Sequence, residues 1–423
     1  MHHIDLLIHN AELVTCAGPG PRRRQAMRDV GALSAAAVAI HNEHIIDIGP
    51  SHVLCSQYQA HTSIDARGMA ICPGFVDPHT HVVYAGDRVA EFEQRIAGTS
   101  YMQIMAAGGG IAFTMQATRA ASLAQLVAET KPRLDAMLRL GTTTAESKSG
   151  YGLSLEAELN QLEASALLDA SHAIDLVPTF LGAHALPPEF RDQPDNYVNI
   201  IIESMLPAVL TWYQASHFKR VGIPLFVDVF CEQNAFNLDQ SRRILTAAKQ
   251  AGLPIKAHVD EFTALGGLAM ALELGAVSVD HLDVSRPEEI ALLAQSESIA
   301  VVIPTVTFHL GGHDYANARG IIDAGGALAL TTDINPGSSP CPSMPFAMAI
   351  ACRYQKLLPS EALIAATLNA AHAIGLGSRI GSIEVGKQAD LLILNTHDYR
   401  HLAYQFGGNL VAMVIKRGKL LQE

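Results

Sequence analysis

The chain has 423 residues, of which 49% are hydrophobic and 17% charged, and its formal net charge at pH 7 is −12. This composition is typical of a large, compact protein and excludes an intrinsically disordered one. The negative charge argues against nonspecific attraction to nucleic acid or to an anionic membrane, so we expect neither partner. A small anionic substrate is still compatible with it, because one buried arginine outweighs distant charges that salt screens.

The six cysteines are scattered along the chain and form no CxxC pair, so we expect reduced and mostly buried thiols. The first residues lack the basic region and the apolar stretch of a secretory signal. No apolar run approaches the ~20 residues that span a bilayer. The expected compartment is therefore the cytoplasm.

Both ends of the chain are rich in short β segments separated by turns. Near the N-terminus, strands are predicted at residues 4–8, 11–16, 35–41, 44–48 and 62–66. Near the C-terminus, strands are predicted at residues 390–395 and 411–417. We predict that residues 1–70 and 381–423 together form one small β-sandwich domain.

Between these ends, short β-branched apolar runs alternate with longer helical stretches. The strands are predicted at residues 71–79, 142–148, 174–180, 225–231, 255–258, 277–281, 300–304 and 328–333. The clearest helices are predicted at residues 123–140, 155–167, 240–251, 264–274 and 287–295. Eight such units indicate an α/β fold in which residues 71–380 form a (β/α)8 TIM-like barrel. A doubly wound open sheet is the alternative, but no GxGxxG motif follows a first strand to favour it.

The motif most informative about function is His79-Thr80-His81, which closes the first predicted barrel strand. Side chains at positions i and i+2 of a strand share one face, so both imidazoles can reach one metal ion. The motif alone is weak, because such pairs of histidines also occur on surfaces and in cores. Its weight comes from polar residues at the ends of later strands.

Three later strands end in such residues, and the active site of a (β/α)8 barrel lies at the C-terminal ends of its strands. His258 ends the fifth strand, His281 the sixth and Asp333 the eighth, although each alone could be structural. Three imidazoles and one carboxylate suit a single zinc or iron ion with a bound water as the nucleophile. The predicted metal ligands are His79, His81, His258 and Asp333.

Three residues of this set are candidates for the chemical step. Asp333 can accept the proton of the water, and His281 is better placed to hold the water or polarise a carbonyl than to bind the metal. Glu261, three residues after His258, is a candidate to carry a proton to a leaving nitrogen. A carboxylate at the start of a helix is a nearly equal interpretation of Glu261.

The chain resembles the amidohydrolase superfamily. The features that carry the resemblance are the predicted barrel, the motif Pro-Gly-x-x-Asp-x-His-Thr-His at its first strand, and the polar residues that end strands five, six and eight. Within the superfamily it is similar to the imidazolonepropionase family. The segments that carry this closer similarity are residues 86–95, 98–102, 108–111, 146–153, 179–184, 228–232, 257–262 and 332–338. They extend over nearly the whole chain and are far more specific than His-x-His alone.

The resemblance implies a reaction in histidine degradation: water opens the ring of 4-imidazolone-5-propanoate, a cyclic amide with a carboxylate tail, and gives N-formimidoyl-L-glutamate. It implies that Arg88 binds the tail carboxylate, since a guanidinium binds a carboxylate through two parallel hydrogen bonds. It further implies that Tyr151 and His184 contact the tail and the ring. The remaining substrate contacts that it implies are Glu261, Asn335, Gly337 and Ser338.

Relatives with two metals carry a carboxylated lysine at the end of strand four, where this chain has Phe230-Cys231-Glu232. Lys148 ends strand two instead, so we expect one metal ion, with Glu232 left open as a further ligand. The glycine run at residues 108–110 lacks the Lys-Ser/Thr of a phosphate loop and is expected to form a tight turn or a lid. The resemblance also implies a homodimer, which the sequence itself does not determine.

Two other functions stay open. One is a metal-dependent deaminase of a cyclic amidine or a nucleobase, because the same fold and metal site host both chemistries. Release of ammonia from such a base would favour it, whereas the residues implied for the carboxylate tail argue against it. The other is a non-catalytic scaffold that serves in protein assembly after losing its metal, and the complete set of predicted ligands argues against that.

Overall fold

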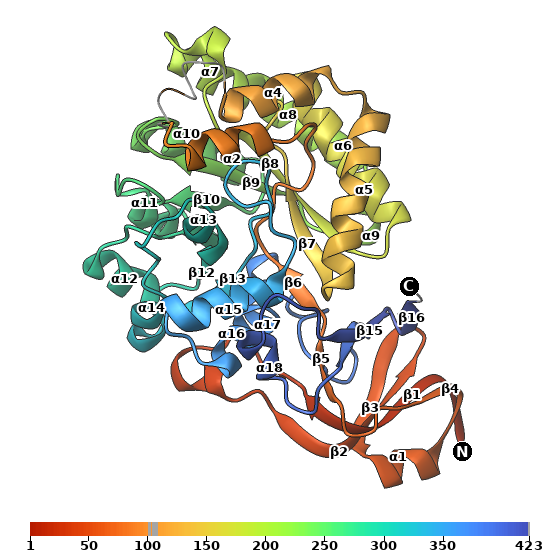
Figure 1. Ribbon diagram of the computed structural model, residues 1–423. Helices are drawn as coiled ribbons and strands as arrows, with labels where there is room; N and C mark the ends of the chain where they lie inside the picture. Colours follow the sequence, from red (N-terminus) through yellow and green to blue (C-terminus); the bar gives the residue numbers. More distant parts are fainter. Residues whose placement is uncertain (100–102, 104–108, 422–423) are drawn as a thin grey trace.

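The computed structural model describes residues 1–99, 103 and 109–421 of the chain. It contains two eight-stranded sheets: a barrel of parallel strands surrounded by helices, and a mixed sheet that lies below the barrel in Figure 1. Among the described residues, no helix combines the length and the apolar character needed to cross a membrane.

The barrel strands are neighbours in chain order, and each neighbouring pair is parallel. They are β6 (Phe75–Asp77), β7 (Thr142–Lys148), β8 (Asp175–Ala183), β9 (Phe226–Cys231), β10 (Lys256–Val259), β11 (Ser278–His281), β12 (Ile299–Val302) and β13 (Ala327–Leu330). The predicted (β/α)8 class is confirmed. The predicted second to eighth strands lie within about three residues of these bounds.

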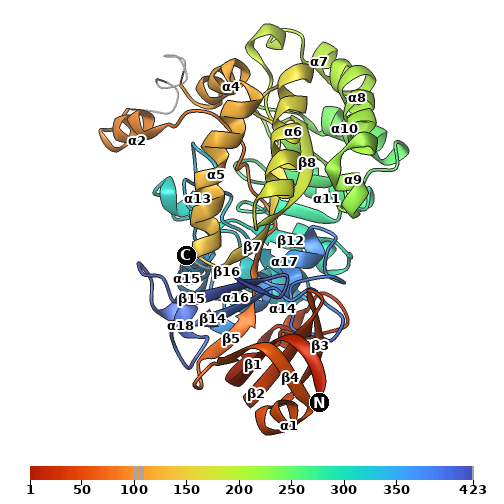
Figure 2. The same cartoon turned by 90° about the vertical axis from the view of Figure 1, so that its right-hand side faces the viewer.

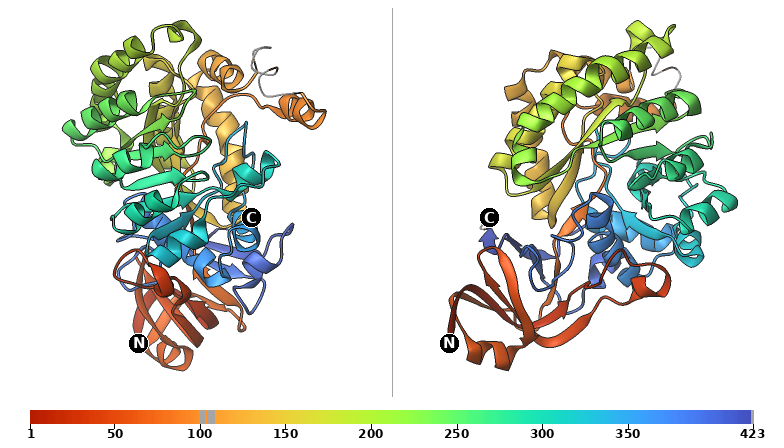
Figure 3. Two further views of the ribbon diagram at one scale, coloured as in Figure 1. Left: turned by 90° about the vertical axis from the view of Figure 1, so that its left-hand side faces the viewer. Right: turned by 180° about the vertical axis from the view of Figure 1, so that it is seen from behind.

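Helices connect the barrel strands and cover the outside of the barrel, whereas α2 projects from the body of the molecule (Figures 2 and 3). They are α2 (Val89–Ile96), α4 (Ile111–Ala120), α5 (Leu123–Arg139), α6 (Leu155–Ser171), α7 (Pro194–Ile200), α8 (Leu206–Ala215), α9 (His217–Val221), α10 (Leu238–Gln250), α11 (Gly267–Glu273), α12 (Pro287–Ala294), α13 (Pro304–His309), α14 (Ala318–Ala324), α15 (Met344–Tyr354), α16 (Pro359–Ala365) and α17 (Leu368–Ala373). A 3-10 turn (Pro188–Phe190) precedes α7, and a π-helical segment (Ile201–Met205) joins α7 to α8.

The five helices named from the sequence pattern correspond to α5, α6, α10, α11 and α12. The pattern did not predict α7, α8 and α9, which together fill the connection between β8 and β9. Prolines mark that segment, and a proline is usually taken as a helix breaker. Here Pro194 lies in the first turn of α7, where the missing N–H has no helical partner to lose, and Pro207 lies at the start of α8, directly after the π-helical segment.

The small sheet combines both ends of the chain, as predicted. Its strands are β1 (His2–Val14), β2 (Ala32–His41), β3 (His44–Pro50), β4 (Tyr58–Asp65), β5 (Ala70–Pro73), β14 (Leu391–Leu394), β15 (Val411–Lys416) and β16 (Lys419–Leu421). The order is β16-β15-β14-β5-β1-β2-β3, with β4 also paired to β1. Short helical turns flank it at η1 (Arg24–Arg28), α1 (Ser51–Gln57) and α18 (His401–Tyr404). The domain limits expected at residues 70 and 380 stay a prediction.

The predicted first barrel strand, residues 71–79, is wrong as one element. It divides at Gly74: β5 belongs to the small sheet, and β6 begins the barrel. The backbone N–H of Gly74 donates to Asp390 O in the small sheet (3.0 Å), and a Cβ at this position would lie 2.3 Å from Thr143 Oγ1. Only glycine therefore lets the chain pass between the two sheets so closely.

Side chains link the two ends of the barrel sheet, β13 and β6. Asp77, the last residue of β6, accepts hydrogen bonds from the Thr331 hydroxyl, from Thr332 N (3.1 Å) and from the Thr332 hydroxyl (2.5 Å). The Thr331 hydroxyl also lies 2.6 Å from His79 O. These contacts bring the segments after β6 and β13 together at the mouth of the barrel.

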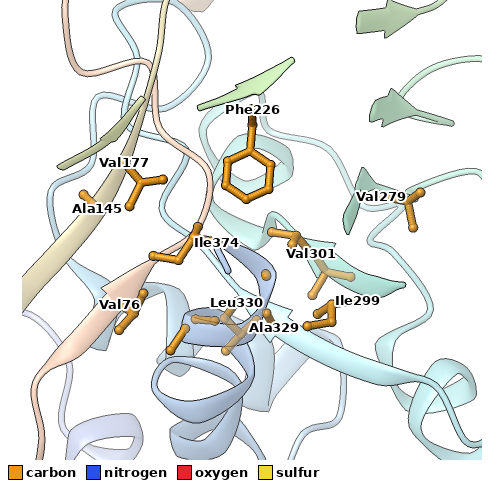
Figure 4. Packing of buried hydrophobic residues seen from close by; sticks show 14 of the residues in the cluster. Val76, Ala145, Val177, Phe226, Val279, Ile299, Val301, Ala329, Leu330 and Ile374 are labelled. Carbon is orange, nitrogen blue, oxygen red and sulfur yellow. The ribbon is translucent and has the colours of Figure 1, made fainter. Parts of the chain in front are cut away.

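A single large apolar cluster holds the strands to the surrounding helices. Figure 4 shows part of it, with Val76, Val301 and Leu330 of the barrel strands gathered around Ile374, which follows α17. All four side chains are at most 1% exposed. Burial on this scale fixes the strand ends, from which the functional loops emerge.

Candidate metal centre and substrate site

The four predicted metal ligands converge at the mouth of the barrel. Nε2 of His79 and Nε2 of His81 each lie 3.7 Å from Oδ1 of Asp333, and Nε2 of His81 lies 3.3 Å from Nε2 of His258. All four side chains are at most 3% exposed. The structure therefore brings together residues that lie on three different barrel connections.

The two histidines of the His-x-His motif lie beyond the end of β6, in a segment without regular secondary structure. Backbone hydrogen bonds hold this segment on both sides, as in a strand: Lys148 N donates to Thr80 O (2.9 Å) and His81 N donates to Ile334 O (3.0 Å). The Thr80 hydroxyl instead donates to Glu146 O (2.5 Å). The extended backbone thus keeps the i, i+2 geometry, and both imidazoles reach Asp333.

The donor atoms fit a metal ion. Within the described part of the chain, Nε2 of His79 and Oδ1 of Asp333 are buried and have no hydrogen-bond partner. Such atoms lower stability unless something else satisfies them. Zinc–nitrogen bonds of about 2.0–2.1 Å place tetrahedral ligands about 3.4 Å apart, close to the 3.3–3.7 Å observed between these donors. Burial holds the pKa of His79 and of His81 well below the ordinary value, so both are neutral, as metal ligands must be.

Carboxylates contact two of the predicted ligand histidines on the ring nitrogen that faces away from the other predicted ligands. Nδ1 of His79 contacts Oδ2 of Asp280 at 2.6 Å, and Nδ1 of His258 lies 2.9 Å from Oδ2 of Asp228. The second contact is close in distance, but its angle departs from that of a hydrogen bond. Histidine ligands of metals usually have such a partner on the other ring nitrogen, which fixes the tautomer and the orientation of the ring.

Beneath these dyads the interior of the barrel holds a buried layer of charge. Its members are fully or almost fully buried and are Glu146, Lys148, Asp228, Lys256 and Asp280. Glu146 and Lys148 are two residues apart in β7, so both point into the barrel, while Ser147 points out and contacts Ser165 of α6 (2.7 Å). The sequence interpretation did not assign this layer. Charged residues at alternate positions of a strand buried on both faces were its detectable signal.

The mouth also carries strained backbone. Asp260, His281 and Asp333 have φ of +56°, +82° and +47°, in the left-handed region that non-glycine residues rarely adopt. Each follows or ends a barrel strand. Such strain persists where the surrounding structure imposes it, most often at functional sites. For Asp333 it turns the carboxylate toward His79 and His81, beyond the end of β13.

His281 and Glu261 face each other beside the ligand histidines. Nε2 of His281 lies 3.6 Å from Oε2 of Glu261, and Nδ1 lies 4.0 Å from Oδ2 of Asp283. Burial, with the nearby charges of Asp283 and Asp333, raises the pKa of Glu261 well above its ordinary value. A protonated carboxyl group is thereby favoured, which suits the predicted proton donor.

Glu232 supports the turn that follows Glu261. Its Oε2 accepts hydrogen bonds from Phe262 N and Thr263 N (3.0 Å each), and its Oε1 accepts one from Gln233 N (2.8 Å). No group of candidate metal ligands among the described residues includes Glu232. The geometry thus gives Glu232 the task of holding a loop, rather than that of an additional ligand.

Tyr151 and His184 line the site on the side of His81. The ring of His184 stacks on that of His81 (centroids 4.7 Å apart, 16° between planes), and the ring of Tyr151 lies 5.3 Å from His184. Nδ1 of His184 contacts Gly150 O at 3.0 Å, and burial lowers the pKa of His184 to about 3. His184 is therefore a neutral imidazole with its other nitrogen available to a ligand.

The N-terminal turns of α6 hold the loop that carries Tyr151. The Glu158 carboxylate accepts hydrogen bonds from the backbone of Gly150, Gly152 and Leu153 (2.7–3.2 Å). Gln161 accepts one from Tyr151 N (3.1 Å) and donates one to Val83 O (2.7 Å), which follows the His-x-His segment. Two residues that the sequence interpretation did not identify thus join two loops of the site.

Arg88 lies at the mouth, next to Gly337, whose missing side chain makes room for it. A Cβ on Gly337 would lie 2.0 Å from one terminal nitrogen of Arg88. The Glu91 carboxylate binds the guanidinium through two hydrogen bonds, one of them 2.8 Å from Nε, and the side chain of Arg88 is 12% exposed. Arg95 donates to Gly337 O (3.1 Å), so two guanidinium groups and one carboxylate meet here. A net positive charge is left at this corner of the site.

The predicted contacts after strand eight form a closed turn. Asn335 Oδ1 accepts hydrogen bonds from Gly337 N and Ser338 N (2.8 Å each), and its Nδ2 donates to Asp333 O (2.8 Å) and lies 3.0 Å from the Ser338 hydroxyl. The amide of Asn335 is therefore used within the turn. It fixes the loop between the ligand Asp333 and the glycine that contacts Arg88.

Gly108 of the predicted lid lies outside the described residues, as do residues 100–102 of the segment that resembles relatives. Gly110 is described: it precedes α4 with φ of +72°, and its N–H donates to Glu91 Oε2 (2.9 Å). The end of the glycine run is thus attached to the residue that pairs with Arg88. A lid at residues 108–110 stays a prediction.

Comparison with known proteins agrees with this geometry. A family model described as "Amidohydrolase family" matches residues 70–421. An imidazolonepropionase of Chloroflexus aggregans is 58% identical over 100% of this chain and 99% of the relative, and one of Herpetosiphon aurantiacus is 52% identical over 100% and 98%. A zinc-bound adenosine deaminase structure from Xanthomonas campestris shares the fold, with a TM-score of 0.75, 21% identity and coverage of 99% and 93%. A guanine deaminase of E. coli does so with a TM-score of 0.69, 15% identity and coverage of 99% and 99%.

Proposed function

Since this chain belongs to the amidohydrolase family, and within it to the imidazolonepropionases, we propose that it hydrolyses 4-imidazolone-5-propanoate to N-formimidoyl-L-glutamate in histidine degradation. The observation that carries this proposal is the full-length match at 58% identity. The converging donors at the barrel mouth support it, because ring opening by water needs an activated nucleophile and a proton donor.

His79, His81, His258 and Asp333 would hold one divalent or trivalent ion, zinc or iron. Such an ion, when bound, acidifies a water molecule and polarises a carbonyl oxygen. The imidazoles and the carboxylate match the preferences of both metals, and two of the imidazoles are already contacted by Asp280 and Asp228. The buried mouth also excludes bulk water from the reacting atoms.

The side chains divide the proton transfers between them. The Asp333 carboxylate accepts a proton from the attacking water, whose oxygen forms the new bond to the ring carbonyl carbon. His281 donates a hydrogen bond to the oxygen on which negative charge develops. The carbon–nitrogen bond then breaks, and the protonated Glu261 gives its proton to the departing ring nitrogen. The proton held by Asp333 restores Glu261 through solvent or product, so the net change is the addition of one water.

The substrate would lie with its ring between His281 and His184 and its propionate tail toward Arg88. Two arginines and one glutamate at that corner leave one positive charge for the tail carboxylate. Tyr151 and the turn from Asp333 to Ser338 enclose the space between ring and tail. The homodimer and the cytoplasmic location stay predictions.

Replacing Arg88 by methionine is expected to raise KM by about 10–100-fold, the range for a lost charged hydrogen bond, with kcat changed less than about threefold. The reason is that Arg88 is proposed to contact the tail and is not one of the proposed metal ligands. Steady-state kinetics measure both constants. A substrate analogue without the tail carboxylate is the matched control, because wild type and Arg88→Met should turn it over equally poorly. An unchanged KM for the natural substrate would refute the role of Arg88.

The proposed reaction is tested by adding 4-imidazolone-5-propanoate to the purified protein and following the loss of its ultraviolet absorbance, with metal analysis on the same sample. We expect turnover that depends on bound metal. Full metal occupancy without turnover would contradict the specific substrate and leave the family membership intact. Release of ammonia from a nucleobase or another cyclic amidine, without ring opening, would favour the deaminase alternative.

A further inference from the structure

Lys148, the last residue of β7, is a fully buried lysine that the proposed chemistry does not use. Its Nζ lies 2.6 Å from Asp228 Oδ2, 3.0 Å from Glu146 Oε2 and 3.5 Å from Asp280 Oδ2. Burial lowers its pKa, but the attraction of these three carboxylates outweighs burial and raises the pKa above the ordinary value. Lys148 is therefore a permanent ammonium ion under the candidate metal centre.

The oxygens that Lys148 contacts are the same ones that face the ligand histidines. Asp228 Oδ2 lies between Lys148 and Nδ1 of His258 (2.9 Å), and Asp280 Oδ2 lies between Lys148 and Nδ1 of His79 (2.6 Å). One ammonium group thus joins two separate carboxylate–histidine dyads, which come from β9 with β10 and from β11 with the segment after β6. A change in its position would move both rings.

We propose that Lys148 is a positioning residue of the metal centre: by holding Asp228 and Asp280 together, it orients His258 and His79 for one ion. The inference rests on the metal centre of the proposed function. It extends that function by assigning a distinct task to a lysine that ends strand two, where no carboxylated lysine was expected. The dyads then act as one unit rather than as two independent supports.

The charge balance of the layer gives a competing explanation of the role of Lys148, and it predicts the opposite effect on metal affinity. The layer holds three carboxylates and the two ammonium groups of Lys148 and Lys256. If these lysines mattered only through their charge, removing either would leave the layer more negative and would strengthen the binding of a cation above it. If Lys148 positions the dyads, its removal weakens metal binding despite that electrostatic gain.

Lys256 supplies the matched control. It is equally buried in the same layer, but its Nζ is bound by Pro78 O (2.7 Å) and Glu146 Oε2 (2.8 Å) and lies 3.8 Å from Asp280 Oδ2. Zinc affinity of the metal-free proteins is measured by competition with a chromophoric chelator. We expect Lys148→Met to weaken zinc binding by about 10–100-fold, as is typical when the partner of a ligand is lost. We expect Lys256→Met to bind zinc as tightly as wild type or more tightly.

Unchanged or tighter zinc binding by Lys148→Met would overturn the proposal, and so would an equal loss in both variants. Thermal unfolding of the metal-free proteins shows whether each variant folds. The same measurement on the wild type tests the metal centre itself: a wild type that binds no zinc and no iron contradicts the proposed function, whereas a tight wild type with a tight Lys148→Met contradicts only the role of Lys148.

A double-mutant cycle in the wild-type lysine background decides the matter if Lys148→Met fails to fold. Asp228→Asn and Asp280→Asn each loosen one dyad, and through Lys148 each also disturbs the other. We expect the combined loss of zinc affinity to be smaller than the product of the two single losses by about fivefold or more. A combined loss equal to that product within about twofold would show two independent dyads and would overturn the proposal.

Discussion

Replacing Asp333 by asparagine is expected to lower kcat by about 10²–10⁴-fold, the contribution of a general base. Asp333 is the carboxylate that both His79 and His81 approach, at 3.7 Å each, and its Oδ1 is buried without a partner among the described residues. An asparagine keeps the size of the side chain but cannot take a proton from water. The activity must be expressed per bound metal ion, so kinetics and metal analysis are performed on the same sample.

Asp260 provides a matched control for Asp333. It is an equally buried aspartate at the mouth of the barrel, and it too has a positive φ, of +56°. Burial raises the pKa of both carboxyl groups, to about 6 for Asp260, but the Asp260 carboxylate accepts a hydrogen bond from Ser285 (2.7 Å) and lies in no group of candidate metal ligands among the described residues. We expect Asp260→Asn to keep kcat within about threefold. Equal losses in both variants would indicate damage to the mouth in general and would contradict a specific role for Asp333.

Replacing His258 by alanine is expected to remove both the metal and the activity. Nε2 of His258 lies 3.3 Å from that of His81, and Asp228 faces its other ring nitrogen. His281→Ala is expected to keep the metal and to lose about 10²–10³-fold in kcat, the effect of one lost donor to a developing oxyanion. The difference follows from the proposed roles: His258 lies beside His81 in the proposed ligand set, whereas Nε2 of His281 lies 3.6 Å from Oε2 of Glu261, the proposed proton donor.

Metal content per chain, measured together with kcat, separates these two histidines. A metal-free His281→Ala variant would make His281 a ligand, in the group that it can form with His79 and His258. A His258→Ala variant that holds a full equivalent of metal would remove His258 from the proposed set. Either result would require a different assignment of the proton transfers as well.

The fold was largely predictable because its strands are local features. Residues 225–231 carry the β-branched and apolar residues of a buried parallel strand, residues 142–148 open with three β-branched threonines, and each run is observed with nearly those bounds. The ligand set was predictable for a related reason: each of its members follows or ends such a strand, and barrel topology brings strand ends to one mouth. The first strand was misread since Gly74, at which it divides, lies within an otherwise continuous apolar run.

The sequence could not show which residues distant along the chain contact each other. Nothing local indicates that Arg95 reaches Gly337 O, or that Gln161 joins the loop of Tyr151 to Val83. The role of Asn335 as a substrate contact stays a prediction, and the structure adds that its amide closes a turn with Gly337 and Ser338. The charged side chains of β7 were visible in the sequence, but their partners in β9 and β11 depend on the closed barrel.

The side-chain contacts between the segments after β6 and β13 have a consequence for the order of events during folding. Asp77 and Thr331 are 254 residues apart, and His81 and His258 are 177 apart. Closing such long loops is entropically costly and comes late, after local units have formed. On the ribosome, His79 and His81 emerge long before the residues that complete the site. A half-made chain therefore lacks two of the four proposed ligands, and we expect the metal ion to bind after the barrel has closed.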